Sequence, residues 1–263
     1  MGASHWSDLA NRWAALGPPL RPPPPAVAAV LGAIAGHTER VLLLGVTPEL
    51  ADAGDEVVAV ERNPDMVGAV WPGDTDHRRA VLGDWRELDV LGATRFTAAI
   101  GDGALACVGH HELPGLLADL VARLRPGGVV AARCFVRPDS AEPLDAVRAD
   151  VLAGRVGSIH ACKWRVAMAV AGEREHPEVP VEDVLAAFDV TFPDRGALAA
   201  ATGWTATAIG SVDAYRGSAD IYSFATAEEL LAAVPDTLAG VDLVPTSGYE
   251  LAERCPVLVL RRR

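Results

Sequence analysis

The chain has few cysteines, and their pattern argues against metal and disulfide chemistry. Only four occur among its 263 residues, at positions 107, 134, 162 and 255. None forms a CxxC pair or has zinc-ligand spacing, so the sequence predicts neither a zinc site nor a disulfide framework. Three lie in apolar stretches, where buried thiols are expected. The adjacent His110 and His111 would point in different directions on most backbones and indicate a solvated loop rather than a metal site.

Positive charge and long apolar runs are also scarce. The formal net charge is −12 at pH 7, which argues against a nucleic-acid partner because such binding relies on Lys and Arg to neutralise phosphates. The terminal RRR is too short to reverse that balance. No apolar run approaches membrane-spanning length, and the N-terminal MGASHWSDLANRW lacks the segments of a signal peptide. We therefore expect a cytoplasmic protein that works without nucleic acid or membrane.

Aromatic residues make up only 5% of the chain, but half of it is apolar. That is enough core for one large α/β domain or two small ones. Strand and helix candidates alternate up to residue 135, a pattern that predicts a parallel sheet with helices on both faces. The helix Leu113–Leu124 should end at LRPGG, where Pro and Gly stop it. The five predicted strands are Arg40–Gly45, Glu56–Glu61, Arg79–Leu82, Phe96–Ile100 and Val129–Phe135.

Residues 1–25 are expected to form an N-terminal arm. Apolar residues at helical spacing predict a helix over Ser7–Leu16. The following GPPLRPPPPAV cannot continue a helix and predicts an extended polyproline segment. The arm would lie over a domain that begins near Ala26 with a helix, Ala26–Gly36. Such an arm is also a candidate for contacts in a homodimer, although nothing in it requires one.

After the fifth strand the alternation of strands and helices ends, and residues 137–237 are predicted to be mostly helical. Long insertions at the carboxyl edge of an α/β sheet usually build a lid or substrate pocket. We therefore divide one domain into the arm (1–25), a core (26–136), this insertion (137–237) and two last strands (238–263). The predicted helices are Ala141–Ala153, Ser158–Ala171, Val181–Phe188, Arg195–Thr202 and Thr226–Val234, the last with a capping box at Thr226 and Glu229; the strands are Gly240–Pro245 and Pro256–Arg261.

The stretch VLLLGVTPELADAGDEVVAVERNPDM, residues 41–66, begins like a nucleotide-binding site but lacks the glycine-rich loop. In open parallel sheets, ligands bind outside the carboxyl ends of the strands, where Gly45, Glu61, Asp84 and Asp102 fall. Gly45 allows a tight turn and close approach of the backbone to a ligand. Glu61 can accept from both ribose hydroxyls, and Asp84 from an adenine amino group beside the flat wall of Trp85. Asp102 would lie at the reactive end of the ligand.

In order and spacing, these residues resemble the class I S-adenosylmethionine-dependent methyltransferases, in their bacterial small-molecule branch. About residues 38–135 match: VLLLGVTPEL, VVAVERNPDMV, GDW, FTAAIGDGAL and LRPGG stand where the five motifs belong. The resemblance implies a Rossmann-like, seven-stranded, mostly parallel sheet whose seventh strand is antiparallel, with S-adenosylmethionine as cofactor and no metal. The cofactor-binding positions that it implies are Gly45, Val46, Thr47, Glu61, Arg62, Asp84, Trp85, Gly101, Asp102 and Gly103.

The first motif departs from the family pattern. The family usually has an acidic residue two positions before this glycine and further glycines after it, whereas here Leu43, Thr47 and Glu49 hold those places. Fewer glycines leave the backbone less freedom to wrap the methionine end, so we expect side chains such as Thr47 to contribute. A pyrophosphate would need several converging backbone amides, which this loop does not offer. The loop therefore favours S-adenosylmethionine over a dinucleotide.

Methyl transfer is an in-line displacement that mainly needs alignment and sometimes removal of a proton. The amino-methylating signature of the family is missing after the fourth strand, where the chain has GDGA. The candidate catalytic residues are Tyr222, Tyr215 and Asp102. The alternative for Tyr222 is packing of a lid, and for Arg216 a surface salt bridge. The candidate substrate-binding residues, from the arm and the insertion, are Trp6, Arg165, Arg216 and Ser223.

Three functions fit these patterns. The leading hypothesis is methyl transfer to O, N or S of a small metabolite, in metabolism or biosynthesis. The second is a cyclase similar to azetidine-2-carboxylate synthases, for which S-adenosylmethionine is the substrate itself and methylthioadenosine is released. The atypical first motif and the polar insertion are compatible with it. The third is a non-catalytic S-adenosylmethionine-binding protein, against which the retention of Glu61, Asp84 and the GDG turn argues.

Overall fold

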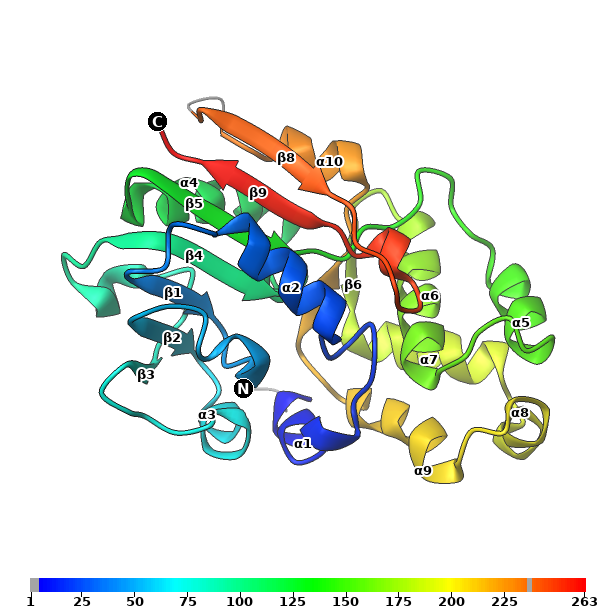
Figure 1. Cartoon of the computed structure of the whole chain (residues 1–263). Coiled ribbons are helices and arrows are strands. Elements are labelled where there is room, and N and C mark those ends of the chain that lie inside the picture. The colour runs from blue at the N-terminus through cyan, green and yellow to red at the C-terminus, as the bar shows by residue number, and fades with distance from the viewer. Residues whose placement is uncertain (1–4, 236–237) are drawn as a thin grey trace.

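A seven-stranded sheet forms the centre of the computed structural model, which describes residues 5–235 and 238–263 (Figure 1). The strand order is β3-β2-β1-β4-β5-β9-β8. Strands β1 to β5 pair in parallel, and β9 is antiparallel to both β5 and β8. Strand order reverses between β1 and β4, where such sheets open to ligands. The strands are β1 (Val41–Leu44), β2 (Val57–Glu61), β3 (Arg78–Leu82), β4 (Phe96–Asp102), β5 (Leu124–Arg133), β8 (Gly240–Val244) and β9 (Val257–Arg261).

Both faces of this sheet are covered by helices, as predicted. Val41 and Leu43 pack on the face that carries α2 and α3, whereas Leu42 and Leu44 pack on the face that carries α4 and α10. Because the central strands are buried on both faces, they are continuous apolar runs rather than alternating ones. The four helices are α2 (Pro24–Ala33), α3 (Pro64–Val70), α4 (Leu113–Arg123) and α10 (Ala227–Ala232).

The insertion forms a helical lobe beside the carboxyl edge of the sheet and has its own apolar core (Figure 1). At its centre lies α6, most of whose side chains are buried. The prediction of a mostly helical insertion missed a small antiparallel sheet of β6 (Glu178–Pro180) and β7 (Ile221–Ser223). A strand of only three residues forms because it pairs with a segment distant in the sequence, so the local sequence pattern does not predict it. The helices are α5 (Leu144–Leu152), α6 (Ile159–Gly172), α7 (Val181–Thr191), α8 (Arg195–Thr202) and α9 (Ala206–Ile209).

The arm differs from its prediction in two places. The single helix expected over Ser7–Leu16 is divided into α1 (Trp6–Ala10) and the 3-10 turn η1 (Trp13–Ala15). Asn11 Nδ2 donates to the Ser7 carbonyl at 3.0 Å, taking the acceptor that the next helical N–H would use. The polyproline segment is also shorter than expected, because Pro24 begins α2. Proline is tolerated there because first-turn N–H groups have no helical partner.

Strand β5 begins earlier than predicted. LRPGG was expected to be a turn after α4, but the strand runs from Leu124 to Arg133. Leu124 pairs with Phe96 before the register shifts to the pair of Val129 and Ala98. Such an irregularity admits Pro and Gly residues, which a regular ladder does not.

Two local predictions are confirmed, the capping box and the buried thiols. The capping box forms, with Thr226 N–H donating to Glu229 Oε2 at 2.7 Å and Glu229 N–H donating to Thr226 Oγ1 at 3.1 Å. Three of the four cysteines are buried thiols. The helix after β1 is only a 3-10 turn, η2 (Pro48–Leu50). No helix within residues 5–235 and 238–263 is long and apolar enough to cross a membrane. The remaining 3-10 turns are η3 (Leu88–Leu91), η4 (Ala104–Cys107), η5 (His110–Glu112), η6 (Gly210–Tyr215) and η7 (Ala252–Arg254).

Candidate functional site

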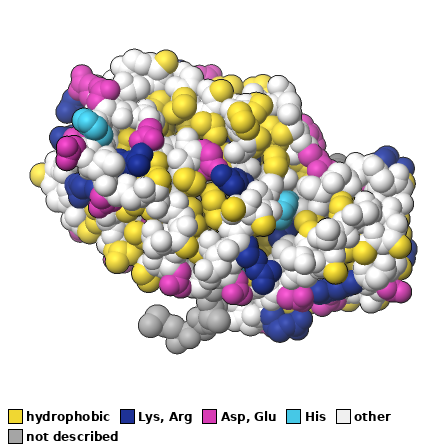
Figure 2. Space-filling model, turned by 60° about the horizontal axis from the view of Figure 1, so that its bottom comes forward, with side chains coloured by type: hydrophobic (Ala, Val, Ile, Leu, Met, Phe, Trp, Pro, Cys, Tyr) yellow, Lys and Arg dark blue, Asp and Glu magenta, His cyan; other side chains and the backbone are white. Residues whose placement is uncertain are grey.

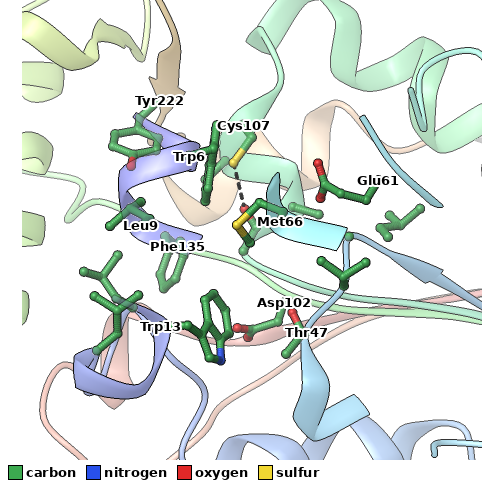
Figure 3. Close-up of a pocket in the computed structure, with 18 of the residues that line it drawn as sticks. Trp6, Leu9, Trp13, Thr47, Glu61, Met66, Asp102, Cys107, Phe135 and Tyr222 are labelled. Carbon is green, nitrogen blue, oxygen red and sulfur yellow. Dashed lines mark hydrogen bonds between the residues drawn. The ribbon is translucent and has the colours of Figure 1, made fainter. Parts of the chain in front are cut away.

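A cavity lies at the carboxyl ends of β1, β2 and β4, where the arm and the insertion meet the sheet (Figure 3). It holds about 860 Å³ of space between atoms, with its open mouth included. The strand-end side is lined by Leu44, Gly45, Val46, Thr47, Glu61, Arg62, Met66, Trp85, Asp102, Gly103, Ala104, Ala106 and Cys107. The opposite side is lined by Trp6, Leu9, Trp13, Leu16 and Leu20 of the arm, and by Phe135, Trp164 and Tyr222.

The wall of this cavity is strongly aromatic in a chain with few aromatic residues. Four of the six tryptophans line it, and Trp6, Trp13 and Phe135 surround its centre in Figure 3. From the side of the arm, Figure 2 shows hydrophobic side chains gathered over the middle of the face. The indole N–H groups of Trp13 and Trp164 are buried and have no hydrogen-bond partner in the protein. An aromatic wall of this kind suits the apolar part of a ligand.

Gly45 and Glu61 bring backbone and carboxylate together on the strand-end side. Gly45 has φ +85°, and a Cβ there would lie 3.7 Å from Glu61 Oε2 and 3.9 Å from the Trp85 ring. Glu61 is buried, and one of its oxygens accepts from Asn63 N–H at 2.8 Å. Burial raises the pKa of Glu61, although that hydrogen bond and Arg62 oppose the shift. Figure 3 shows the carboxylate turned to the inside of the cavity, where it can accept from ligand hydroxyls.

Asp102 is held by a buried arginine. Its carboxylate accepts from Arg133 Nε, and from Arg133 Nη2 at 3.0 Å. Arg133 Nη2 also donates to the Pro19 carbonyl of the arm at 2.8 Å. Burial opposes the charge of Arg133, but the carboxylate of Asp102 overrides it and raises the pKa of the guanidinium. Asp102 therefore lines the cavity as one half of an ion pair that also fastens the arm.

A second polar network joins the arm to β7. His5 is buried, with its Nε2 2.7 Å from Tyr222 Oη and its Nδ1 3.0 Å from Asp220 Oδ2. Ser218 Oγ lies 3.1 Å from the same Nδ1. Arg62 Nη2 donates to the other Asp220 oxygen at 3.2 Å. The network connects the first described residue of the arm to Tyr222, whose side chain lines the cavity.

Some predicted site residues lie outside this cavity. Asp84 accepts from Arg86 Nη2 at 2.6 Å and lines a different hollow. Burial acts to raise its pKa, but the hydrogen bonds from Arg86 prevail and lower it. Gly101 lies within β4 against Leu44. The adenine contact of Asp84 and the cofactor contact of Gly101 stay predictions.

The predicted acceptor residues are also dispersed. Arg165 donates to Asp150 at 2.6 Å, pairs with Glu142 and lines another hollow. Arg216 is exposed and donates to Asp213 at 3.2 Å, which is the surface salt bridge of the alternative interpretation. The remaining two, Tyr215 and Ser223, are buried but do not line the cavity. Of the candidate substrate and catalytic residues, Trp6, Tyr222 and Asp102 border the cavity.

The sequence suggests that His5 of the arm folds over the cofactor together with Trp6, but it does not join His5 to Ser218 and Asp220. The signal was present in part, because Ser218, Asp220 and Tyr222 recur at every second residue and an extended chain turns such residues to one side. Nothing in the sequence shows that this side meets a histidine more than two hundred residues away. The lining by Trp13, Phe135 and Trp164 was missed for the same reason.

No family model and no curated protein matches the sequence, but its fold matches many solved structures. One is the N-methyltransferase NodS from Bradyrhizobium japonicum WM9 with S-adenosylhomocysteine, at 14% identity, 98% and 99% coverage of this chain and that one, and TM-score 0.52. Another is the DhpI-SAM-HEP complex, at 15% identity, 98% and 94% coverage, and TM-score 0.54.

A third similar structure carries a different name. It is a Rhodobacter sphaeroides protein provisionally named as a zinc-dependent alcohol dehydrogenase, at 15% identity, 98% and 96% coverage, and TM-score 0.61. Within the part of this chain that the structure describes, no three His, Cys, Asp or Glu side chains gather in a group that could hold a metal ion. At these identities the likeness concerns the fold alone. The chain has the Rossmann-like fold of the class I S-adenosylmethionine-dependent methyltransferases.

Proposed function

We propose that the protein binds S-adenosylmethionine in this cavity and transfers its methyl group to a small molecule. The observation that carries the proposal is the position of Gly45 and Glu61 beside Trp85, at the switch point of the sheet. The ribose would lie on Glu61, and the adenine against Trp85. Thr47 and the turn of Asp102 and Gly103 would border the methionine end. The names of NodS, an N-methyltransferase, and of DhpI with SAM support this choice of ligand.

A small molecule is favoured as acceptor by charge and by enclosure. The net charge of −12 disfavours nucleic acid. The arm and the insertion cover the cavity with apolar side chains, so an acceptor has to enter a confined, largely apolar space. Transfer then needs alignment of the acceptor atom, the methyl carbon and the sulfur, with water kept out by these walls.

The first experiment tests the ligand and the reaction together. We expect S-adenosylmethionine and S-adenosylhomocysteine to bind in isothermal titration calorimetry with one molecule per chain. Incubated with S-adenosylmethionine alone, the protein should leave it intact, and an added acceptor should yield S-adenosylhomocysteine in mass spectrometry. Rapid release of methylthioadenosine together with a four-membered-ring amino acid would establish the cyclase in its place. Absence of binding would reject both.

Glu61→Ala tests the placement of the ribose. Loss of hydrogen bonds to a carboxylate should weaken S-adenosylhomocysteine binding by about 1–3 kcal/mol, measured by calorimetry. The matched control is Glu39→Ala, whose exposed carboxylate pairs with Arg125 far from the cavity; it should bind like the unaltered protein. Equal affinity of the two variants would show that the ribose lies elsewhere.

A further inference from the structure

The side of the cavity opposite the strand ends has a distinct chemical character. The charged side chains at the cavity wall, Glu61, Arg62 and Asp102, all come from strand ends. Among the described residues on the other side, none that lines the cavity is charged, and the wall there is aliphatic and aromatic. A charged acceptor would lose its hydration there without a counter-charge, at considerable cost. This half of the cavity therefore fits a neutral, planar and apolar molecule.

Among the described residues that line this half, Tyr222 carries the group with acid–base capacity, its hydroxyl. The Tyr222 hydroxyl lies 2.7 Å from His5 Nε2, and His5 Nδ1 lies 3.0 Å from Asp220 Oδ2. A carboxylate only accepts hydrogen bonds, so the hydrogen of the neutral imidazole belongs on Nδ1. That leaves Nε2 as an acceptor for the Tyr222 O–H. The hydrogen bonds therefore all run in one direction: Tyr222 donates to His5, and His5 donates to Asp220.

Building on the proposed function, we propose that the acceptor is a neutral, planar hydroxyl compound of phenol type, whose proton leaves through Tyr222 to the pair of His5 and Asp220. The acceptor oxygen attacks the methyl carbon, the C–O bond forms, and the C–S bond breaks with its electron pair on sulfur. The acceptor proton passes to Tyr222 Oη while the Tyr222 proton passes to His5 Nε2. The products are a methyl ether, S-adenosylhomocysteine and an imidazolium held by Asp220, which later releases the proton to solvent.

The electrostatic surroundings of His5 suit a proton acceptor. Burial lowers its pKa below the ordinary 6.5; Asp220 opposes this shift, and the positive charges of Lys163 and Arg62 add to it. The imidazole is therefore neutral at pH 7. Tyr215 and Tyr222 pack edge-on against its ring, Trp6 lies tilted against it, and Ser218 lies beside Nδ1. Burial raises the pKa of Tyr222 well above 10, so Tyr222 passes a proton on rather than ionising by itself.

The aromatic wall beside Tyr222 supports a planar ligand. Trp164 is 2% exposed, lines the cavity, and stacks edge-on against Tyr222 with ring centroids 5.0 Å apart. Its indole N–H has no partner in the protein, and neither has that of Trp13 across the cavity. A planar molecule could place its faces against these aromatic walls.

The class of acceptor is tested by binding to the full-length protein saturated with S-adenosylhomocysteine. The probes are a matched pair, a naphthol and the naphthylmethylamine of the same skeleton, which is cationic at pH 7. Because four tryptophans line the cavity, their fluorescence reports binding. We expect the naphthol to bind at least about ten times more tightly. Equal or tighter binding of the amine, or no binding of the naphthol, would overturn the acceptor class, whereas failure to bind S-adenosylhomocysteine would instead reject the proposed function.

The proton path is tested by turnover of the best-bound hydroxyl compound. Tyr222→Phe and His5→Gln should each lower kcat by about 100-fold or more, because a group that transfers a proton usually contributes a rate factor of this size. The unaltered enzyme should lose activity as the pH falls through the pKa of His5, below 6.5, because an imidazolium accepts no proton. His5→Gln should lack this acid limb.

Asp220→Asn and His77→Gln complete the series. Asp220→Asn keeps the shape of the network and should lower kcat by a larger factor than it lowers the affinity for S-adenosylhomocysteine. His77→Gln alters an exposed histidine and is the matched control, with normal kcat and pH profile. If Tyr222→Phe turned over normally, or if His5→Gln kept the acid limb, His5 would only fasten the arm and the proton path would be wrong.

Discussion

Lys163 is the only lysine in the sequence, and it lies fully buried inside the insertion. Its Nζ donates to Ser211 Oγ at 3.1 Å and lies over the Tyr215 ring, 5.4 Å from the centroid. No carboxylate accepts from it in the described structure, in contrast to the many paired arginines. Burial therefore lowers its pKa from 10.5 to about 7.

This burial predicts a pH-dependent stability. Between about pH 7 and 10.5 the unfolded chain binds more protons at Lys163 than the folded chain, so this group makes the free energy of unfolding rise with pH in that window. Lys163→Met removes the effect. The free energy of unfolding of the variant should therefore exceed that of the unaltered protein by the largest amount near pH 7 and below. This difference should shrink towards pH 10.5.

Urea unfolding at pH 7, 8.5 and 10 measures that difference. A difference that stays constant with pH would show that the amine is not perturbed. A direct check is an NMR titration of a lysine-labelled sample, whose side-chain signal needs no assignment because the sequence has one lysine. A midpoint near 10.5 would contradict the expectation in the same way.

At the scale of elements, the turn after β4 decides the shape of the site. Gly103 is left-handed, with φ +67° and ψ 1°, and is the N-cap residue that precedes η4. A Cβ there would stand 2.6 Å from the Phe135 ring, which lines the cavity. The turn thus needs glycine both for its backbone and for the close approach of an aromatic side chain from the end of β5.

Gly103→Ala should combine two costs. A left-handed conformation costs an L-residue about 1–2 kcal/mol, and Phe135 must move in addition. We expect a larger loss of stability than that strain alone, measured by urea unfolding, and weaker S-adenosylhomocysteine binding in calorimetry. The control is Gly203→Ala, at φ +74° and ψ 5° with no neighbour within 4 Å of a Cβ, which should show the backbone strain alone. Equal losses of stability in the two variants would mean that the Phe135 side chain moves aside without cost.

At the scale of the whole molecule, the arm connects the two sides of the cavity. One end is joined to the insertion through His5 and Asp220. Farther along, the Pro18 carbonyl accepts from Ser158 Oγ at 3.3 Å, and Arg21 pairs with Glu49 at 2.5 Å. Its helical pieces have five and three residues, too short to be stable alone. The arm is therefore ordered by these contacts.

Hydrogen exchange should reveal this dependence. In the free protein we expect amides of residues 6–16 to exchange much faster than those of β1, β2 and β4, because local opening of the arm leaves the sheet intact. Saturation with S-adenosylhomocysteine should slow exchange in the arm, since the ligand would contact both the arm and the strand ends. Mass spectrometry measures both. Arm amides as protected as those of β4, or unaffected by ligand, would contradict this role.

The sheet and the strand-end half of the site follow from local patterns in the sequence. Apolar runs such as VLLL and VVAV fit only strands buried on both faces, and residues that follow parallel strands meet at one edge. Gly45, Glu61 and Asp102 could therefore be placed together in advance. The broken arm helix and the long β5 could not, because Asn11 and a register shift act against the local pattern.

The other half of the cavity depends on how distant segments of the chain pack together. It brings Trp6 and Trp13 of the arm to Trp164 of α6, and it pairs His5 with Tyr222 across more than two hundred residues. It also turns Arg165 and Arg216 away to acidic partners. The physical reason is that local periodicity fixes which face of an element is apolar, whereas the partner of that face depends on how separate elements pack together.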